Sequence, residues 1–264
     1  GDKSTKSLSY KRNYLKGKKY IFALTVCILP FTFGFIIPVS RMLYWAWLSK
    51  NYLIELNTFQ LTFNTLTIAL LASISTVVLS ILLGFSSKYF KSSIVQSSNR
   101  FASLGYSTPG AVIAMGALIL VGYVSSAFNI IISGTMLLLI FAYIVRFLAV
   151  AYQPIISGFE KNCDELNDAS KTLGVSPVYS LVKINLPLIK NTLIAAGLLV
   201  FIDATKELPL TLILRPFNYE TLATATFDLS NQAQIIESSI PSLFIIFLTV
   251  IPIIYLNRRI GEGR

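Results

Sequence analysis

The sequence predicts an all-α membrane protein with six transmembrane helices, on the basis of its composition, its apolar runs and the placement of its charges. The 264 residues are 54% hydrophobic and 13% charged, with a mean hydropathy of +0.68. This composition leaves too little polar surface for a soluble domain of this size. A transmembrane helix needs roughly 20 mainly apolar residues. Six stretches meet this requirement: 21–46, 62–86, 106–127, 130–152, 188–206 and 240–257.

The basic residues indicate the topology, because they are concentrated in alternate connections between the predicted spans. Most of the 22 lysines and arginines lie in the N-terminal segment, in the connections 88–100 and 161–190, and after residue 257. The positive-inside rule assigns this side to the cytoplasm. We therefore expect both termini to be cytoplasmic, and we attribute the net charge of +10 to topology rather than to nucleic-acid binding.

Three segments are expected from this topology. They are a basic cytoplasmic linker at 1–20, a transmembrane domain at 21–257 and a cytoplasmic tail at 258–264. The linker has no apolar run and no small-residue cleavage site, so it does not have the pattern of a signal peptide. A tail that binds anionic lipid headgroups is the alternative interpretation of residues 1–20.

The first span is expected to kink and to end in an aromatic belt. It contains Pro30, Gly34 and Pro38, and a proline inside a helix removes a backbone hydrogen bond. Three aromatic residues follow between Tyr44 and Trp47, at the predicted outer interface.

The third and fourth spans each carry one unusual feature. Pro109-Gly110 predicts an irregular start to the third span, and Gly110 with Ala114 forms a small-xxx-small pair that permits close helix packing. Arg146 lies near the predicted cytoplasmic end of the fourth span. A side chain at that depth is expected to reach the interface.

The longest polar segment of the second half runs from Cys163 to Pro187. Apolar or small residues recur at i, i+3, i+4 and i+7 from Leu166, which predicts an amphipathic helix. Gly174 is placed to stop that helix in a left-handed conformation. Ser176-Pro177 then forms an N-cap and first-turn pair for a second short helix, which Pro187 is expected to end.

This segment resembles the EAA loop of the membrane subunits of ABC importers, a bent element that docks on the ATPase. Asp168-Ala169-Ser170, three residues, Gly174, nine residues and then Ile184-Asn185-Leu186-Pro187 reproduce the spacing of that loop. Asp168 replaces the usual glutamate, and Ser170 replaces the second alanine. The resemblance, over a coupling loop at 160–187, implies these ATPase-coupling residues: Asp168, Ala169, Ser170, Gly174, Ile184, Leu186 and Pro187. An ordinary amphipathic cytoplasmic loop is the alternative interpretation.

Three ionisable residues, Asp203, Lys206 and Glu207, mark the outer end of the predicted fifth span. Asp203 and Glu207 are four residues apart and would share one helical face. Ionisable residues inside a membrane are a functional hypothesis by default, so we expect the three to line a translocation pathway or outer gate. A mutually neutralising ion cluster is the alternative.

The run from Lys206 to Leu229 closely resembles the segment that follows this helix in iron(III) permeases. The resemblance implies the type I ABC permease fold and a permease for ferric iron, in a bacterial cytoplasmic membrane. Six helices would form half of a pathway that works by ATP-driven alternating access. Sulfate, thiamine, polyamine and phosphonate permeases share the docking loop, so these cargoes stay as alternatives.

No catalytic chemistry is expected in this chain. The Walker A pattern GxxxxGK[ST] is absent from the sequence, so ATP and Mg should be bound by a partner. Histidine is absent too, which removes histidine-dependent zinc sites and Ser-His catalysis. Cys27 and Cys163 lie in different environments and should not pair. An intramembrane aspartyl protease is a remote alternative, because Asp203 has no second aspartate on another span.

The resemblance also implies a set of partners. They are an ABC ATPase dimer, a second permease half or identical subunit, a periplasmic or lipid-anchored substrate-binding protein, and membrane lipid. A channel or ion-coupled carrier would instead show an internal repeat with broken helices, and the sequence shows none.

Overall fold

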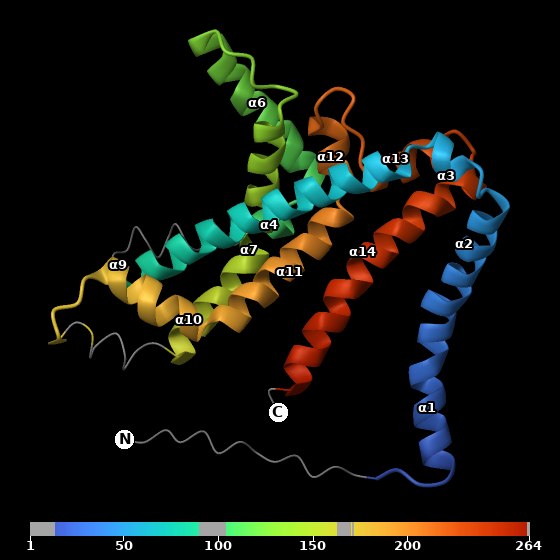
Figure 1. Cartoon of the computed structure of the whole chain (residues 1–264), viewed down its shortest axis with the longest axis horizontal. Coiled ribbons are helices and arrows are strands. Elements are labelled where there is room, and N and C mark those ends of the chain that lie inside the picture. Colours follow the sequence, from blue (N-terminus) through green and yellow to red (C-terminus); the bar gives the residue numbers. More distant parts are fainter. Residues whose placement is uncertain (1–13, 90–103, 163–169, 171, 263–264) are drawn as a thin grey trace.

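Figure 1 shows the chain, a computed structural model, as an arrangement of long helices. The structure describes residues 14–89, 104–162, 170 and 172–262, and every regular element within them is helical. Five helices are long and apolar enough to span a membrane, and the bent pair Pro177–Leu188 plus Lys190–Thr205 makes a sixth candidate. The predicted all-α fold is confirmed, and the six predicted spans correspond to these five helices and the bent pair.

The first span is one continuous helix that contains a local π turn. It consists of α1 (Lys18–Phe31), the π-helical η1 (Thr32–Ile36) and α2 (Ile37–Leu48). Pro38 has no N–H to donate to the Gly34 carbonyl, and a π turn is one way to route backbone bonds around such a gap. None of the residues in these three segments is buried, and α2 is the part of this helix that packs against another span, the last one.

The core of the bundle is built from three long helices. They are α4 (Thr58–Tyr89), α7 (Met136–Asn162) and α11 (Lys190–Thr205), and each packs against the other two. Small residues line their contacts: Ala69, Ala72, Ala142, Ala151 and Ala196 are fully buried. Small side chains let helix backbones approach closely. Tyr143, Phe147 and Phe159 fill the remaining volume.

Two predicted spans have different boundaries in the structure. The third, α6 (Gly110–Phe128), begins after a 3-10 turn, η2 (Gly105–Ser107), with Pro109 as its N-cap. The predicted irregular start is thus present, although the helix begins later than residue 106. The fourth span, predicted over 130–152, is α7. Residues 130–135 instead form a connection in which Gly134 has a positive φ of 72°.

The coupling loop predicted at 160–187, called the docking segment from here on, leads into α11 through a sharp bend. A short rod consists of α9 (Pro177–Ser180), the π-helical η3 (Leu181–Asn185) and α10 (Leu186–Leu188), and it meets α11 at 77°. The second helix, predicted to end at Pro187, ends one residue later at Leu188. Pro187 lies in the first turn of α10, where its missing N–H costs nothing, and the chain turns at Ile189.

The end of the bundle opposite α9 and α10 is made of short helices, from which the last span returns. After α11 come α12 (Pro209–Leu214) and α13 (Leu222–Asn231), and α3 (Tyr52–Glu55) precedes α4. The last span, α14 (Ile235–Glu262), is longer than the predicted 240–257 and packs against α2, α11 and α13. Figure 1 places α12 and α13 at the end of α11 that is remote from α9 and α10.

Candidate functional site

The bend of the docking segment is formed by a left-handed glycine. Gly174 has a φ of +71°, and the Val175 N–H donates to the Ser170 carbonyl at 3.0 Å. A bond between residues five apart, with a left-handed residue just before its donor, is the Schellman helix stop. Ser176 then caps α9 by accepting from the Tyr179 N–H. The predicted helix stop and restart are both present.

The inner face of this bend is polar and its outer face is apolar. The Ser170 and Ser180 hydroxyls are buried and lie 3.2 Å apart. Leu173 is 81% exposed, and Val178 and Tyr179, at the start of α9, are exposed as well. Two of the predicted coupling residues are less exposed than these three side chains. Leu186 packs on the hydrophobic core, and Ile184 is half-buried. Asp168 and Ala169 lie outside the described residues.

A buried ion pair joins the middle of α7 to the end of α11. Arg146 Nε donates to Glu207 Oε2 at 3.0 Å, and Glu207 is 7% exposed. The second guanidinium nitrogen, Nη1, donates to the Thr108 carbonyl at 2.8 Å, just before α6. The arginine fork therefore contacts two separate chain segments at once.

This geometry corrects two predictions. Arg146 does not lie near the end of its helix, because α7 continues sixteen residues beyond it to Asn162, and its guanidinium instead binds Glu207. Glu207 does not share a helical face with Asp203, because α11 ends at Thr205. Pro209 has no N–H to donate to the Thr205 carbonyl, which is one reason for the break. The signal that sequence analysis missed is Arg146 itself, since an arginine within an apolar run usually has an acidic partner.

Two glycines permit the close approach around this pair. A Cβ at Gly110 would clash with Glu207 Oε1 and press on the Arg146 guanidinium, and a Cβ at Gly105 would clash with the Val145 carbonyl. The expected packing role of Gly110 and Ala114 agrees with their burial on one face of α6.

The segment after the break is held to the same place by hydroxyl groups. Thr211 in α12 donates to the Glu207 carbonyl at 2.7 Å, and its Oγ1 also contacts the Tyr143 hydroxyl on α7. The ion pair is therefore surrounded by α6, α7 and α12.

Asp203 and Lys206 form a separate, more accessible pair. Lys206 Nζ lies 3.0 Å from Asp203 Oδ1, with side chains 59% and 19% exposed respectively. The three predicted pathway residues thus divide into this partly exposed pair and the buried Glu207. Among the residues that the structure describes, no group of three or more histidine, cysteine or acidic side chains could hold a metal ion.

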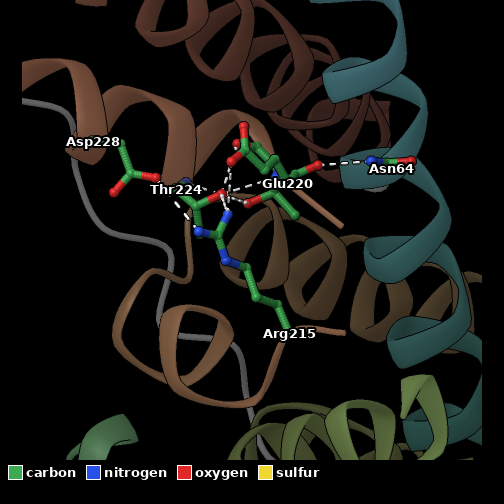
Figure 2. Close-up of polar contacts among 6 residues, drawn as sticks. Asn64, Arg215, Glu220, Thr224 and Asp228 are labelled. Atoms are coloured by element: carbon green, nitrogen blue, oxygen red, sulfur yellow. Dashed lines mark hydrogen bonds and ion pairs between the residues drawn. The ribbon is translucent and has the colours of Figure 1, made fainter. Parts of the chain in front are cut away.

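A second polar cluster fixes the outer segment between α12 and α13, as Figure 2 shows. Arg215 lies 3.5 Å from both Glu220 and Asp228 and donates to the Thr224 hydroxyl at 3.2 Å. Thr224 is also half of the capping box that starts α13. The arginine therefore holds the turn against the first helical turn of α13.

Asn64 of α4 holds this turn from the opposite side. Its amide donates to the Glu220 carbonyl at 2.8 Å, and the Tyr219 hydroxyl donates to the Asn64 carbonyl at 3.2 Å. Burial raises the pKa of Tyr219 above its ordinary range, so its hydroxyl remains a donor at neutral pH.

The sequence matches one family over most of its length. Residues 76–259 match the family described as binding-protein-dependent transport system inner membrane component. The Fe(3+)-transport system permease protein FbpB 2 of Haemophilus influenzae is 26% identical over 239 residues, which are 86% of this chain and 46% of that protein. The putative 2-aminoethylphosphonate transport system permease protein PhnV of Salmonella typhimurium is 23% identical over 62% of this chain and 63% of its own length. The chain spans less than two thirds of either relative.

The fold is similar to that of solved ABC transporters. A bacterial transporter that imports the acidic polysaccharide alginate has a chain with a TM-score of 0.71 at 14% identity, covering 91% of this chain and 94% of that one. A bacterial alginate transporter in complex with a pentasaccharide-bound periplasmic protein gives 0.69 at 12% identity, with coverages of 90% and 93%. At these identities the likeness concerns the fold alone.

Proposed function

Because the chain belongs to the family of binding-protein-dependent transport system inner membrane components, we propose that it forms half of the pathway of an ABC importer whose cargo is ferric iron. ATP would be hydrolysed by a partner dimer, with ATP and Mg bound there. The second half would be another permease unit or an identical subunit. A periplasmic or lipid-anchored binding protein would deliver the cargo.

The observation that carries this proposal is the geometry of the docking segment. A Schellman stop at Gly174, a new helix at Pro177 and a 77° bend into α11 together place an exposed apolar surface at one end of the bundle. Leu173, Val178 and Tyr179 supply that surface. Exposed apolar side chains grouped on a polar segment are typical of a protein–protein contact. We assign this contact to the ATPase, and under this proposal the segment and both termini are cytoplasmic.

Iron is supported by sequence similarity. The relative whose alignment covers 86% of this chain, at 26% identity, is a Fe(3+)-transport permease. The run 206–229 also resembles iron(III) permeases. The candidate 2-aminoethylphosphonate is favoured by the shorter match to PhnV. Ferric iron is a trivalent cation, whereas 2-aminoethylphosphonate carries an anionic phosphonate group and an ammonium group. Uptake of each cargo can be measured separately.

The proposed role of Asp203 and Lys206 is to line the outer part of the pathway. Asp203 is partly exposed and lies at the outer end of α11. A single exposed carboxylate is a weak iron ligand, which suits passage because strong binding would hold the ion. Asp203→Asn should therefore slow iron uptake while thermal stability stays near that of the wild type, because the pair with Lys206 is a partly exposed pair worth about 0–1 kcal/mol.

The test is uptake by the complete complex in proteoliposomes, with ATPase, second half and binding protein present. Radiolabelled ferric iron and 2-aminoethylphosphonate are offered separately, each with ATP or without. ATP-dependent uptake of iron alone supports the proposal. Uptake of the phosphonate alone would replace iron by the second cargo, and ATP-independent uptake of either would contradict the importer assignment.

A further inference from the structure

The two helices on either side of the docking segment, α7 and α11, pack against each other and make specific contacts at two levels. Near the docking segment, α7 and α11 touch where Gly158 faces Ile189 and Thr192, since a Cβ built at Gly158 would lie 3.4 Å from both side chains. Further out, Arg146 of α7 binds Glu207, just after α11. The two levels are twelve residues apart on α7, about 18 Å.

The outer connection also reaches beyond these two helices. Arg146 donates to the Thr108 carbonyl ahead of α6. Glu207 Oε1 accepts from the Leu210 N–H at 3.4 Å, and the Glu207 carbonyl accepts from Thr211. One charged pair therefore holds the end of α11, the start of α6 and the short helix α12 to the middle of α7.

The helical break beside Glu207 gives this pair its mechanical importance. The helix α11 is preceded by the bend at Ile189, next to the docking segment, and is followed by a break in the helix after Thr205. Without a fixed contact at the break, a movement of α11 would bend the non-helical connection after Thr205. The helices that follow would then stay in place. The ion pair is the only charged contact that the described residues provide between the break and another helix.

We propose that Arg146 and Glu207 are positioning residues that carry the movement of the docking segment to α6 and α12. The inference rests on the proposed function, because it takes the docking segment to be driven by an ATPase. While the pair is intact, α7, α11 and the start of α6 move as one body. When it is broken, the docking segment still moves, but the outer helices no longer follow.

The test compares ATP hydrolysis and cargo uptake by the same proteoliposomes, using the complete complex and ferric iron. Glu207→Gln removes the charge, and Arg146→Lys keeps the charge but loses the fork that contacts Glu207 and Thr108 together. We expect both variants to hydrolyse ATP in response to the binding protein, while iron taken up per ATP falls about tenfold, a typical size for coupling between sites.

A further variant separates transmission from stability. Arg146→Met with Glu207→Met removes both charges at similar volume, which leaves no unpaired buried charge. We expect this double variant to be more thermally stable than either single methionine variant and still to take up less iron per ATP. It also keeps the test valid if the single variants fail to fold.

The matched control is Ser73→Ala, which removes an inter-helix hydrogen bond of 2.7 Å from α4 to the Gly197 carbonyl in the middle of α11. Its ratio of uptake to hydrolysis should equal that of the wild type. A wild-type ratio in the double variant would overturn the inference. A wild-type complex without ATP-dependent uptake would instead contradict the proposed function, so the two failures are distinguishable.

Discussion

Asn64 and Glu220, 156 residues apart in the sequence, are joined by a hydrogen bond of 2.8 Å from the Asn64 amide to the Glu220 carbonyl (Figure 2). The Tyr219 hydroxyl donates back to the Asn64 carbonyl. Next to it, the Thr65 hydroxyl accepts from the Leu222 N–H at 2.9 Å. One helical turn of α4 therefore fixes both the turn after α12 and the start of α13.

Replacing Asn64 by leucine should loosen this outer turn. Leucine keeps the branching of the side chain, although it is larger, and it leaves the Glu220 carbonyl without its donor, which costs about 1–3 kcal/mol. We expect a lower unfolding temperature in detergent and faster chymotrypsin cleavage after Phe217. The control is Thr62→Val, because the Thr62 hydroxyl bonds only to Thr58 of its own helix. Equal cleavage rates in both variants would contradict the assigned role.

Adding a methyl group at Gly110 should destabilise the protein, whereas the same change at Gly116 should not. A Cβ at Gly110 meets Glu207 and Arg146, but a Cβ at Gly116 meets nothing within 4 Å. Overpacking costs about 1–3 kcal/mol, while alanine is favoured over glycine in an open helical position by up to about 1 kcal/mol. Thermal unfolding of the two variants measures the difference. A Gly110→Ala protein as stable as Gly116→Ala would show that the ion pair does not need this space.

The features that the sequence predicted correctly depend on neighbouring residues. The six apolar runs, the stop at Gly174 and the cap at Ser176 are each determined within a few positions. The irregular start at Pro109 and the buried face of Gly110 and Ala114 are equally local. Such features are visible in a single sequence because the backbone conformation of each one follows from its own residue types.

The Arg146–Glu207 pair could not be predicted in the same way, because it depends on where α11 ends. Continuing the helix through Glu207 placed that carboxylate beside Asp203 instead. Pro209 was the available signal, since a proline four residues after Thr205 removes the next helical hydrogen bond. Even with the break recognised, the choice between Asp203 and Glu207 as the partner of Arg146 requires the packing of α6, α7 and α11.

A double-mutant cycle should show that Arg146 and Glu207 are coupled. Arg146→Met and Glu207→Met each leave one buried charge unpaired, which costs about 3–5 kcal/mol, whereas removing both leaves none. We therefore expect each single variant to be much less stable than the double variant. Thermal or denaturant unfolding of all four proteins measures the coupling. Additive losses would mean that the two side chains do not interact.

The topology can be tested with a membrane-impermeant maleimide on intact spheroplasts. The distribution of basic residues predicts that Cys163 is cytoplasmic and that Asn218, after α12, is on the opposite side of the membrane. We expect Cys163 to remain unlabelled and a cysteine introduced at Asn218, in a Cys27→Ser background, to react. Permeabilised cells, in which Cys163 becomes reactive, provide the control. Labelling of Cys163 from outside would invert the assignment of both termini.

Valine at Gly174 should impair docking, whereas asparagine should be tolerated. No atom lies within 4 Å of a Cβ at this position, so the effect of a side chain comes from its φ of +71° rather than from a clash. A left-handed conformation costs an ordinary residue about 1–2 kcal/mol, and a β-branched residue more, while asparagine adopts it more readily than most. Valine would therefore favour a continued helix and displace Leu173 and Tyr179 from the exposed surface. Copurification with the ATPase and ATP hydrolysis by the complex should both fall for Gly174→Val and remain near wild type for Gly174→Asn. If both variants bind the ATPase equally well, the bend is not needed for docking, and the contact must lie elsewhere on the cytoplasmic side.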